Sequence, residues 1–374
     1  MNSIYDAIIV GGGVIGGSIA FQLAKRGKKV LLLEKDRLAS KASNAAAGML
    51  GAQSELDPDN PLFTIASRSR AMFPALAEEL KDISGIDIEL VNKGMYKVAL
   101  SSDQVAELKN MIKVQQNAGL EAEWLSTAEI RKTEPLLSDE IKGAIFIPND
   151  GQVSATRLSL AFTESAAALG VDIKEFVHVS DLVTENGCVT GVVTDIGRFS
   201  SENVIVAGGA WSAFLLEKSG IILDSYPVKG ECFSVLTDRP LLEKTIFSHG
   251  CYLVPKVGGR IIVGATVKAN TFDQKVSLEG ISTLIERATQ LLPAIKGTEL
   301  EKTWAGIRPQ TGDGLPYFGE HPACKGLFIA TGHYRNGILL SPITGVLIAD
   351  ILERKANPEW SPFRLDRSKQ PLFS

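Results

Sequence analysis

The chain has 374 residues, of which 45% are hydrophobic, and its formal net charge is −4. This length favours two domains, and the composition is that of an ordinary soluble globular protein rather than a disordered or fibrous one. The slight acidic excess argues against nucleic acid as the main partner, and the longest apolar runs fall short of the roughly 18–20 residues that a membrane span needs.

The cysteines and histidines show no spacing that indicates a metal site or a disulfide framework. No CxxC motif occurs, which in a chain of this length favours reduced thiols in the cytoplasm. The histidines also lack the spacing of metal ligands, so we expect no metal. The first residues lead straight into a strand with no basic segment and no cleavage site, so we expect no signal peptide.

Residues 6–35, "DAIIVGGGVIGGSIAFQLAKRGKKVLLLEK", predict a strand, a glycine turn, an amphipathic helix and a second strand. Gly11, Gly13 and Gly16 fit the G-x-G-x-x-G pattern. Gly11 permits the tight turn, Gly13 lets a pyrophosphate approach the backbone, and Gly16 lets the helix pack closely on the strand. Because strand, helix and second strand follow in order, the motif indicates a dinucleotide site.

Glu34 stands at the carboxyl end of the second strand. An acidic residue there accepts hydrogen bonds from the adenosine ribose and disfavours a 2′-phosphate, so an NADP preference is not expected. The motif alone leaves NAD and FAD open.

Residues 40–49, "SKASNAAAGM", follow the second strand at once. Ser43 is a candidate helix N-cap, and the small residues after it allow close approach to an anion or a ring. An ordinary, well-capped alanine-rich helix explains the same pattern equally well. Further along, the patterns predict helices over 61–83, 102–118, 126–135 and 156–169, and a strand over 94–100.

After the helix at 156–169, residues 171–183 predict one strand, and Asn186-Gly187 predicts a hairpin turn. The stretch "ENVIVAGGAWS", residues 202–212, is an apolar strand that ends in glycines. Gly209 is therefore a further candidate for close approach to a cofactor.

The middle of the chain changes character. Residues 228–237, 250–256 and 259–268 are rich in β-branched and aromatic residues between glycine turns, which predicts antiparallel strands. We expect these strands, with residues 85–100 and 144–152, to form a separate sheet. A cleft between that sheet and the nucleotide-binding part would hold the substrate.

Residues 278–293 predict a helix, and the end of the chain then returns to the nucleotide-binding part with a strand at 327–330, a glycine turn and a long apolar helix. The predicted fold class is α/β, or α+β overall. A Rossmann-like dinucleotide domain is interleaved with a substrate domain on a mostly antiparallel sheet. The predicted boundaries are 1–84, 153–225 and 300–374 for the first domain, and 85–152 and 226–299 for the second.

Six stretches carry a resemblance to a known family: the opening fingerprint, "SNAAAGM", "VIVAGGAWS", "PVKGE", "WAGIRPQTGDGLPYFG" and "TGHYRNGILLSP". In this order they resemble FAD-dependent amine oxidoreductases of the D-amino-acid oxidase and sarcosine oxidase type, and among these the bacterial glycine oxidases of the thiamine pathway. The resemblance extends from Tyr5 to about Asp366.

This resemblance implies tightly bound FAD. Sarcosine oxidases attach FAD to a cysteine in the segment that matches "WAGIRP", and this chain has no cysteine there, so we expect non-covalent FAD. The implied contacts run from the pyrophosphate and adenosine to the flavin. The implied cofactor residues are Gly11, Gly13, Val14, Ile15, Gly16, Glu34, Lys35, Ala42, Ser43, Ala47, Gly48, Met49, Val179, Gly209, His333, Tyr334, Arg335, Asn336, Gly337, Ile338 and Leu339.

The resemblance also implies the substrate site. Arg308 would bind the substrate carboxylate, the Tyr252 hydroxyl would add a second donor, Arg335 would lie beside the flavin and the entrance, and Met49 would line the pocket. Without the resemblance, an arginine before proline is more often a surface residue and a strand tyrosine is more often part of the core.

The chain departs from some relatives near the tyrosine. Gly250 stands where those relatives have histidine, with His249 one position away, and Val267 stands where some have methionine. These differences leave open the preference among glycine, sarcosine and small D-amino acids. We expect His249 to be peripheral.

The implied reaction is oxidative deamination of glycine and other small amines by hydride transfer to flavin N5. Oxygen is the electron acceptor, and the products are glyoxylate through the imine, ammonia and H2O2. Catalysis would depend mainly on orienting the substrate. We expect a cytoplasmic homotetramer without a membrane partner. The alternatives are a sarcosine oxidase or D-amino-acid dehydrogenase on the same fold, an NAD-dependent dehydrogenase, and a non-catalytic flavoprotein subunit.

Overall fold

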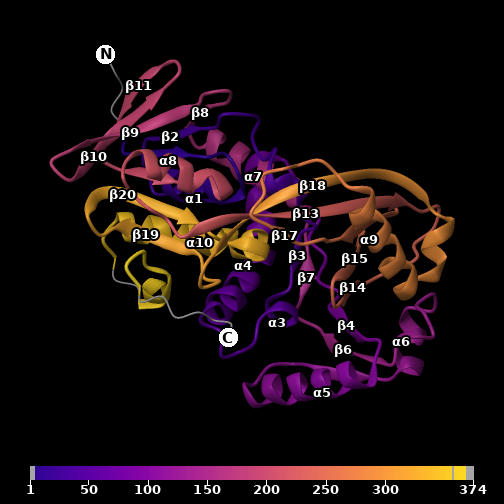
Figure 1. Cartoon of the computed structure of the whole chain (residues 1–374). Helices are drawn as coiled ribbons and strands as arrows, with labels where there is room; N and C mark the ends of the chain where they lie inside the picture. The colour runs from indigo at the N-terminus through magenta and orange to yellow at the C-terminus, as the bar shows by residue number, and fades with distance from the viewer. Residues whose placement is uncertain (1–4, 356–357, 368–374) are drawn as a thin grey trace.

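The computed structural model describes residues 5–355 and 358–367 of the chain. The first four residues, which bear on the expectation about a signal peptide, lie outside the described residues. The described chain forms two large sheets that lie side by side, with helices packed against both (Figure 1).

The first sheet has nine strands in the order β11-β10-β20-β12-β1-β2-β8, with β19 beside β20 and β9 beside β10. Its central strands are parallel and apolar, as strands covered on both faces require. Its strands are β1 (Ala7–Val10), β2 (Val30–Leu33), β8 (Asp172–Lys174), β9 (Val179–Glu185), β10 (Cys188–Thr194), β11 (Gly197–Ser200), β12 (Val204–Val206), β19 (Tyr317–His321) and β20 (Cys324–Thr331).

Helices cover one face of the first sheet and a strand layer covers the other. The helical face is formed by α1 (Val14–Lys25), α4 (Pro61–Ser84), α7 (Ala155–Ala168) and α10 (Gly337–Leu352). On the opposite face, β9 and β10 pack with α8 (Ser212–Lys218) over the same central strands.

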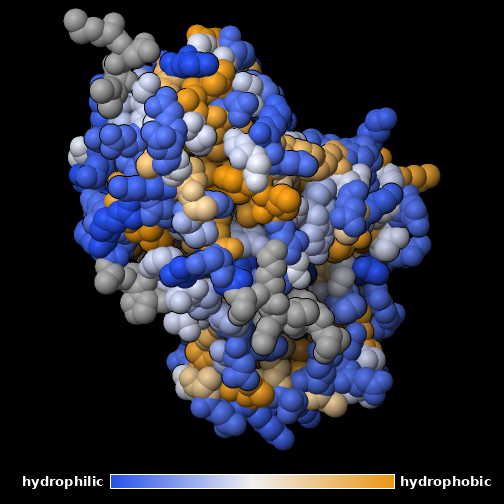
Figure 2. Space-filling view, turned by 60° about the vertical axis from the view of Figure 1, so that its left-hand side comes forward, coloured by the Kyte–Doolittle hydropathy of each residue, from blue (hydrophilic) through white to orange (hydrophobic). Residues whose placement is uncertain are grey.

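On the face of the molecule drawn in Figure 2, hydrophilic residues cover most of the surface and apolar residues gather in a patch near the centre.

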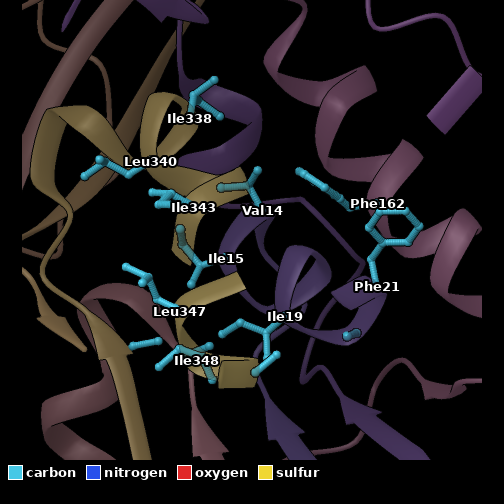
Figure 3. Packing of buried hydrophobic residues seen from close by; sticks show 14 of the residues in the cluster. Val14, Ile15, Ile19, Phe21, Phe162, Ile338, Leu340, Ile343, Leu347 and Ile348 are labelled. Atoms are coloured by element: carbon cyan, nitrogen blue, oxygen red, sulfur yellow. The ribbon is translucent and has the colours of Figure 1, made fainter. Parts of the chain in front are cut away.

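The largest core lies between α1 and α10. Figure 3 shows Ile15 and Ile19 of α1 facing Leu347 of α10, while Phe21 contacts Phe162 of α7 at a ring-centroid distance of 5.9 Å. Two glycines permit this close helix packing, because a Cβ at Gly17 would lie 3.0 Å from Thr163 of α7 and a Cβ at Gly345 of α10 would lie 2.4 Å from Ser18 Oγ. The core thereby fixes the N-terminal ends of α1 and α10 relative to the first sheet.

The helix Tyr334–Leu352, which comprises η3 (Tyr334–Asn336) and α10, is by length and composition apolar enough to cross a membrane, with a mean hydropathy of 1.3 over an 18-residue window, whereas the expectation from the sequence concerned uninterrupted apolar runs. Scattered serine, threonine and proline residues interrupt its apolar runs, which is why run length alone missed it. In the structure 67% of the 18-residue window is buried inside the fold, as in a core helix.

The second sheet has the order β17-β13-β16-β15-β14-β4-β6-β5, with β18 along the free side of β13. It is antiparallel except where β14 runs parallel to β4. The predicted strands at 94–100, 228–237 and 250–256 are confirmed, whereas residues 259–268 form one strand over Arg260–Gly264 and only begin a second one at Lys268. Its strands are β4 (Met95–Ala99), β5 (Glu123–Leu125), β6 (Gly143–Ile147), β13 (Ser225–Leu236), β14 (Thr245–Ser248), β15 (Cys251–Lys256), β16 (Arg260–Gly264), β17 (Lys268–Ala269) and β18 (Glu299–Thr311).

Helix α9 (Leu278–Leu291) packs on one face of the second sheet through Ile281 and Leu284. A small sheet of β3 (Met49–Leu50) and β7 (Gly151–Gln152) lies outside both large sheets. The remaining elements are α2 (Ala42–Ala45), α3 (Ala52–Glu55), α5 (Ser102–Asn117), α6 (Thr127–Thr133), η1 (Gly209–Trp211), η2 (Pro293–Gly297), η3 (Tyr334–Asn336) and η4 (Pro358–Phe363).

Two further strand predictions are corrected. Residues 171–183 form β8 and β9 rather than one strand, because β8 pairs with β2 whereas β9 pairs with β10. Residues 85–100 and 144–152 do not all join the second sheet, since only β4 and β6 do, whereas Val91 bridges to Gln152 of β7 and β7 pairs with β3.

The two large sheets draw on interleaved parts of the chain, and the predicted domain boundaries stay a prediction. Strand β18 spans the boundary at 299/300: the prediction assigns residues 300–311 to the nucleotide-binding domain, whereas their strand pairs with β13 of the second sheet.

Candidate functional site

A cavity of about 440 Å³ lies where the two sheets meet. Its lining contains the glycine turn after β1, the ends of β2 and β12, the segment from α2 to β3, and residues of β13, β15 and β18. Eighteen of the residues implied as cofactor contacts line it: Gly11, Gly13, Val14, Ile15, Glu34, Lys35, Ala42, Ser43, Ala47, Gly48, Met49, Val179, Gly209, His333, Tyr334, Arg335, Gly337 and Ile338.

Three of the implied contacts do not line the cavity. Gly16 lies behind the turn, Asn336 is the residue before α10, and Leu339 is buried in the core of the first sheet. Leu339 follows Ile338 by one position, and successive helical residues point about 100° apart, so only Ile338 reaches the cavity. The contacts of all these residues with a cofactor stay predictions.

The glycine turn fits a pyrophosphate. Gly11 has φ +115°, and a Cβ there would lie 2.6 Å from the Ala207 carbonyl oxygen. A Cβ at Gly13 would fill the concave side of the turn and would lie 3.2 Å from Ser43 Oγ. Helix α1 starts after Gly13, which as the N-cap residue has no side chain that could cap the helix, and its first turn has no acidic residue. Its positive N-terminal end is therefore available to an anion.

The Glu34 carboxylate is fixed at the end of β2 by two backbone donors. Its Oε2 accepts a hydrogen bond from Gly12 N at 2.7 Å, and its Oε1 accepts one from Asp36 N at 2.9 Å. Each carboxylate oxygen can accept more than one hydrogen bond. Glu34 can therefore hold the turn and still accept hydrogen bonds from ribose hydroxyls.

Ser43 is not the N-cap that the sequence predicts. Helix α2 is a single turn with Lys41 at its N-cap position, and Ser43 lies inside it. The Ser43 hydroxyl accepts a hydrogen bond from Val14 N at 2.9 Å. Ser43 thus holds the N-terminus of α1 in place across a long sequence separation.

Sequence reasoning missed one aromatic residue of the cavity wall, Trp211, which lies beside Lys35. Trp211 lines the cavity in η1, and the Lys35 ammonium lies 5.0 Å from its ring centroid. The Trp211 ring also packs on Phe272 at 5.5 Å. Trp211 stands inside the quoted stretch "VIVAGGAWS", so an aromatic residue directly after the strand-end glycines was the available signal.

The turn from β20 to α10 closes the opposite side of the cavity. His333 is buried, its Nε2 lies 3.2 Å from Thr344 Oγ1, and burial lowers the pKa of His333 to about 3. The imidazole is therefore neutral at physiological pH. Helix α10 follows η3 directly, and the first residues of α10 line the cavity. The positive end of this helix therefore points toward the cavity.

The packing of the chain around position 48 requires a glycine, whether or not a cofactor is bound. Its φ is +82°, and a Cβ there would lie 1.9 Å from the Val153 carbonyl oxygen. Met49 follows in β3, where it pairs with Gln152 and packs beside Tyr252. This segment connects the cofactor side of the cavity to the substrate side.

The second sheet places Arg308 and Tyr252 at one end of the cavity, and two glycines make room for them. A Cβ at Gly230 would lie 2.2 Å from the Arg308 guanidinium, and a Cβ at Gly264 would lie 2.4 Å from the Tyr252 hydroxyl. Sequence reasoning did not identify either glycine as part of the site, although Gly230 belongs to the quoted "PVKGE".

The Arg308 guanidinium has spare hydrogen-bonding capacity. It donates one long hydrogen bond of 3.4 Å, from Nη1 to the Thr266 carbonyl oxygen, and forms no ion pair with a carboxylate in the described part of the chain. An arginine in this state, facing a cavity, can bind a carboxylate with two parallel hydrogen bonds.

Tyr252 and Cys232 form a buried neutral pair next to that arginine. The Tyr252 hydroxyl lies 3.5 Å from Cys232 Sγ, and burial raises the pKa of Tyr252 well above its ordinary value. Burial likewise raises the pKa of the Cys232 thiol. Tyr252 therefore keeps its proton and is available as a hydrogen-bond donor.

Arg335 differs from Arg308 because it already has a partner. Its Nε lies 2.9 Å from Glu55 Oε2, and its side chain is 38% exposed. The nearby Glu55 carboxylate raises the pKa of Arg335. Glu55 also lines the cavity, and sequence reasoning missed it because it stands in no recognisable motif.

The positions that differ from some relatives do not line the cavity. His249 and Gly250 form the exposed turn between β14 and β15, and Val267 is 63% exposed. Over residues 5–355 and 358–367, no group of three or more His, Cys, Asp or Glu side chains could hold a metal ion.

Comparisons with known proteins find similarity over nearly the whole chain. The sequence model of one family, described as "DAO: FAD dependent oxidoreductase", matches residues 6–351. A glycine oxidase of Geobacillus kaustophilus is 48% identical over 372 residues, which cover 98% of each chain. The crystal structure of glycine oxidase from Geobacillus kaustophilus has a TM-score of 0.95 at 47% identity, covering 98% of this chain and 100% of that one. The bifunctional protein ThiO/ThiG of Trichormus variabilis is 35% identical over 381 residues, which are 99% of this chain and 57% of that protein.

Proposed function

This chain belongs to the DAO family of FAD-dependent oxidoreductases, and from that membership we propose that it oxidises glycine and other small amines, with oxygen as the electron acceptor. The family resemblance drawn from the sequence is confirmed, the chain is an enzyme, and its cofactor is FAD. Sarcosine and small D-amino acids are the further substrates that we propose.

The observation that carries this proposal is the free guanidinium of Arg308 beside the neutral hydroxyl of Tyr252. The two groups lie at one end of a cavity whose other end is a pyrophosphate-binding turn. A monocarboxylate fits two donors that face the same cavity, Arg308 from β18 and Tyr252 from β15, and the glycine oxidase relatives act on a substrate of this kind. The implied roles of Arg308 and Tyr252 are part of the proposal.

The residues of the chain act mainly by orientation. Arg308 binds the substrate carboxylate and Tyr252 donates a second hydrogen bond, which fixes the α-carbon of the substrate relative to the cavity wall. Burial around Tyr252 and Cys232 excludes water and favours the uncharged form of the substrate amine. Bound FAD supplies the acceptor for two electrons, which oxygen takes up as H2O2. The imine product then hydrolyses to glyoxylate and ammonia.

The cofactor would be held by the glycine turn, Glu34 and the start of α10. The proposed attachment is non-covalent, because residues 304–309 contain no cysteine. Precipitation with acid should release the yellow colour into the supernatant. A pellet that keeps the flavin would contradict this part of the proposal.

A role in forming the thiazole of thiamine is proposed from the relatives. The match to the bifunctional ThiO/ThiG protein leaves the rest of that protein for its second function. We further propose a cytoplasmic enzyme that forms a homotetramer. The homotetramer is proposed from the family resemblance.

The test is an assay of oxygen uptake and H2O2 across glycine, sarcosine, D-alanine and proline with the purified flavoprotein. We expect turnover with glycine and stoichiometric H2O2. Turnover only with a quinone or dye acceptor would favour a D-amino-acid dehydrogenase, and a strong preference for sarcosine would favour a sarcosine oxidase. No turnover in a protein that retains FAD would favour a non-catalytic subunit.

A further inference from the structure

An ion pair of Glu55 and Arg335 lies at the cavity and is not used by the proposed reaction. Glu55 is the last residue of α3 and Arg335 lies in η3, so two segments far apart in the sequence meet here. The Arg335 Nε to Glu55 Oε2 distance is 2.9 Å, and the Glu55 side chain is only 10% exposed. Both residues line the cavity.

Arg335 faces the same end of the cavity as the substrate groups. Its guanidinium carbon lies 5.8 Å from the centroid of the Phe247 ring. Phe247 pairs directly with Tyr252 across β14 and β15, so the two side chains lie on the same face of the second sheet. The end that binds a carboxylate therefore has two guanidinium groups, of which only Arg335 has a carboxylate partner among the described residues.

Helix α3 is held at its beginning, so the position of Glu55 is fixed. The buried Asp150 carboxylate accepts hydrogen bonds from Gln53 N at 3.3 Å and Ser54 N at 2.8 Å. These are free N–H groups in the first turn of α3, which Asp150 caps from another part of the chain. The Arg70 guanidinium in turn pairs with Asp150.

A second contact holds the other end of α3. The Lys97 ammonium of β4 donates a hydrogen bond to the Ser54 carbonyl oxygen at 3.0 Å, directly before Glu55. The same ammonium lies 5.8 Å from the Phe247 ring centroid. Glu55 is therefore attached to the second sheet and held against Arg335, unlike a surface carboxylate that samples many positions.

We propose that Glu55 limits the enzyme to substrates with a single carboxylate by occupying the Arg335 guanidinium. The inference rests on the proposed function and names the substrate class of the same site. A dicarboxylic amine that places one carboxylate on Arg308 would bring its second carboxylate to a cation that already has a partner and next to the negative charge of Glu55. Without the Glu55 charge, Arg335 is free to bind the second carboxylate.

The test is the affinity of the FAD-containing enzyme for acetate and malonate, measured from the change in the visible flavin spectrum. In Glu55→Gln we expect malonate to bind about tenfold more tightly, as one charge-assisted hydrogen bond allows. Acetate affinity should change by less than about threefold, since acetate does not extend to Arg335. The malonate-to-acetate ratio is the quantity that carries the inference.

Two further variants test whether the change in the malonate-to-acetate ratio comes from the contact between Glu55 and Arg335. Glu320→Gln removes the same charge and also breaks an ion pair with an arginine, Arg354, but Glu320 does not line the cavity. It should leave the ratio unchanged. The double variant Glu55→Gln/Arg335→Gln should lose the gain for malonate. Glu55→Ala repeats the test in case Glu55→Gln loads FAD poorly.

An unchanged ratio in a Glu55→Gln enzyme that retains FAD would overturn the proposal, and so would a gain that persists in the double variant. Weaker glycine binding with no gain for malonate would also overturn it, because Glu55 would then contact the substrate amine. Ligand titration needs no turnover, so it reports on Glu55 even where the wild-type enzyme fails to oxidise glycine. Oxidation of iminodiacetate relative to glycine, which should rise in Glu55→Gln, is the matching activity measurement.

Discussion

The first sheet contributes glycine turns and helix N-termini to the cavity wall, whereas the second sheet contributes the side chains of Tyr252 and Arg308. The nucleotide end depends on backbone N–H groups and on positions where no Cβ fits. The substrate end depends on side-chain donors from two strands of the second sheet, β15 and β18, that are separated by β13 and β16. Damage to the first end should therefore reduce FAD binding and stability, and damage to the second should reduce substrate affinity while FAD stays bound.

The largest expected effect is at the substrate end. Arg308→Ala removes the guanidinium that we propose binds the substrate carboxylate, and we expect the apparent KM for glycine to rise at least about a hundredfold. FAD content, measured by absorbance, should not change because the proposed cofactor groups come mainly from the first sheet. Arg308→Lys keeps the charge without the bidentate geometry, so its apparent KM for glycine should lie between those of the wild type and Arg308→Ala. Unchanged glycine kinetics in Arg308→Ala would remove this residue from the site.

Gly16→Ala tests the nucleotide end. A Cβ at Gly16 would lie 1.9 Å from the Gly11 carbonyl oxygen, so α1 or the turn must shift. We expect a loss of about 1–3 kcal/mol in the free energy of unfolding and loss of FAD during gel filtration. Gly297→Ala is the control, because a Cβ there meets nothing within 4 Å. Full FAD retention in Gly16→Ala would contradict the importance of the turn geometry.

Tyr252→Phe should weaken substrate binding while FAD stays bound. Loss of one hydroxyl donor to a carboxylate should raise the apparent KM for glycine about tenfold. Tyr5→Phe is a matched control, since the Tyr5 hydroxyl bonds to Asp172 at 2.7 Å and Tyr5 does not line the cavity. That control should lower thermal stability without a change in KM. An equal rise in KM in both variants would show that Tyr252 acts through stability alone.

The smallest effect is expected for Ser43→Ala. It removes the acceptor for Val14 N, and loss of one hydrogen bond of about 1 kcal/mol should weaken FAD binding about fivefold. Ser159→Ala also removes a buried hydroxyl, one that bonds within α7 away from the cavity, and should leave FAD affinity unchanged. If the two variants bind FAD equally well, the serine is not needed to hold the turn.

The difference between the two sheets also explains which parts of the structure can be predicted well from the sequence. Strand β1, helix α1 and strand β2 follow one another within a short stretch, so their periodicity, their glycines and the position of Glu34 can be interpreted locally. The interleaving of the chain is also visible, since a strand and an apolar helix return near its end. The resemblance to relatives pointed to Arg308 and Tyr252, which no local pattern marks as a pair.

The parts that could not be predicted depend on contacts between distant residues. Ser43 satisfies the rule for an N-cap, and only the position of α1 shows that its hydroxyl bonds to Val14 instead. Strand β18 shows little alternation of polar and apolar residues, and its length follows from pairing with β13. Glu55 has no motif, and its contact with Arg335 exists only because α3 and η3 meet.

The position of β20 in the first sheet has a consequence for the order of synthesis. This strand lies between β10 and β12 in the interior of the sheet, yet it comes from residues 324–331, near the end of the chain. A ribosome therefore releases β1, its glycine turn and β12 long before the strand that completes their sheet. The nascent chain cannot form the finished nucleotide-binding wall until residues 324–331 have left the ribosome. A chain that stops before Cys324 would leave β12 as an open apolar edge, which makes truncated products prone to aggregation.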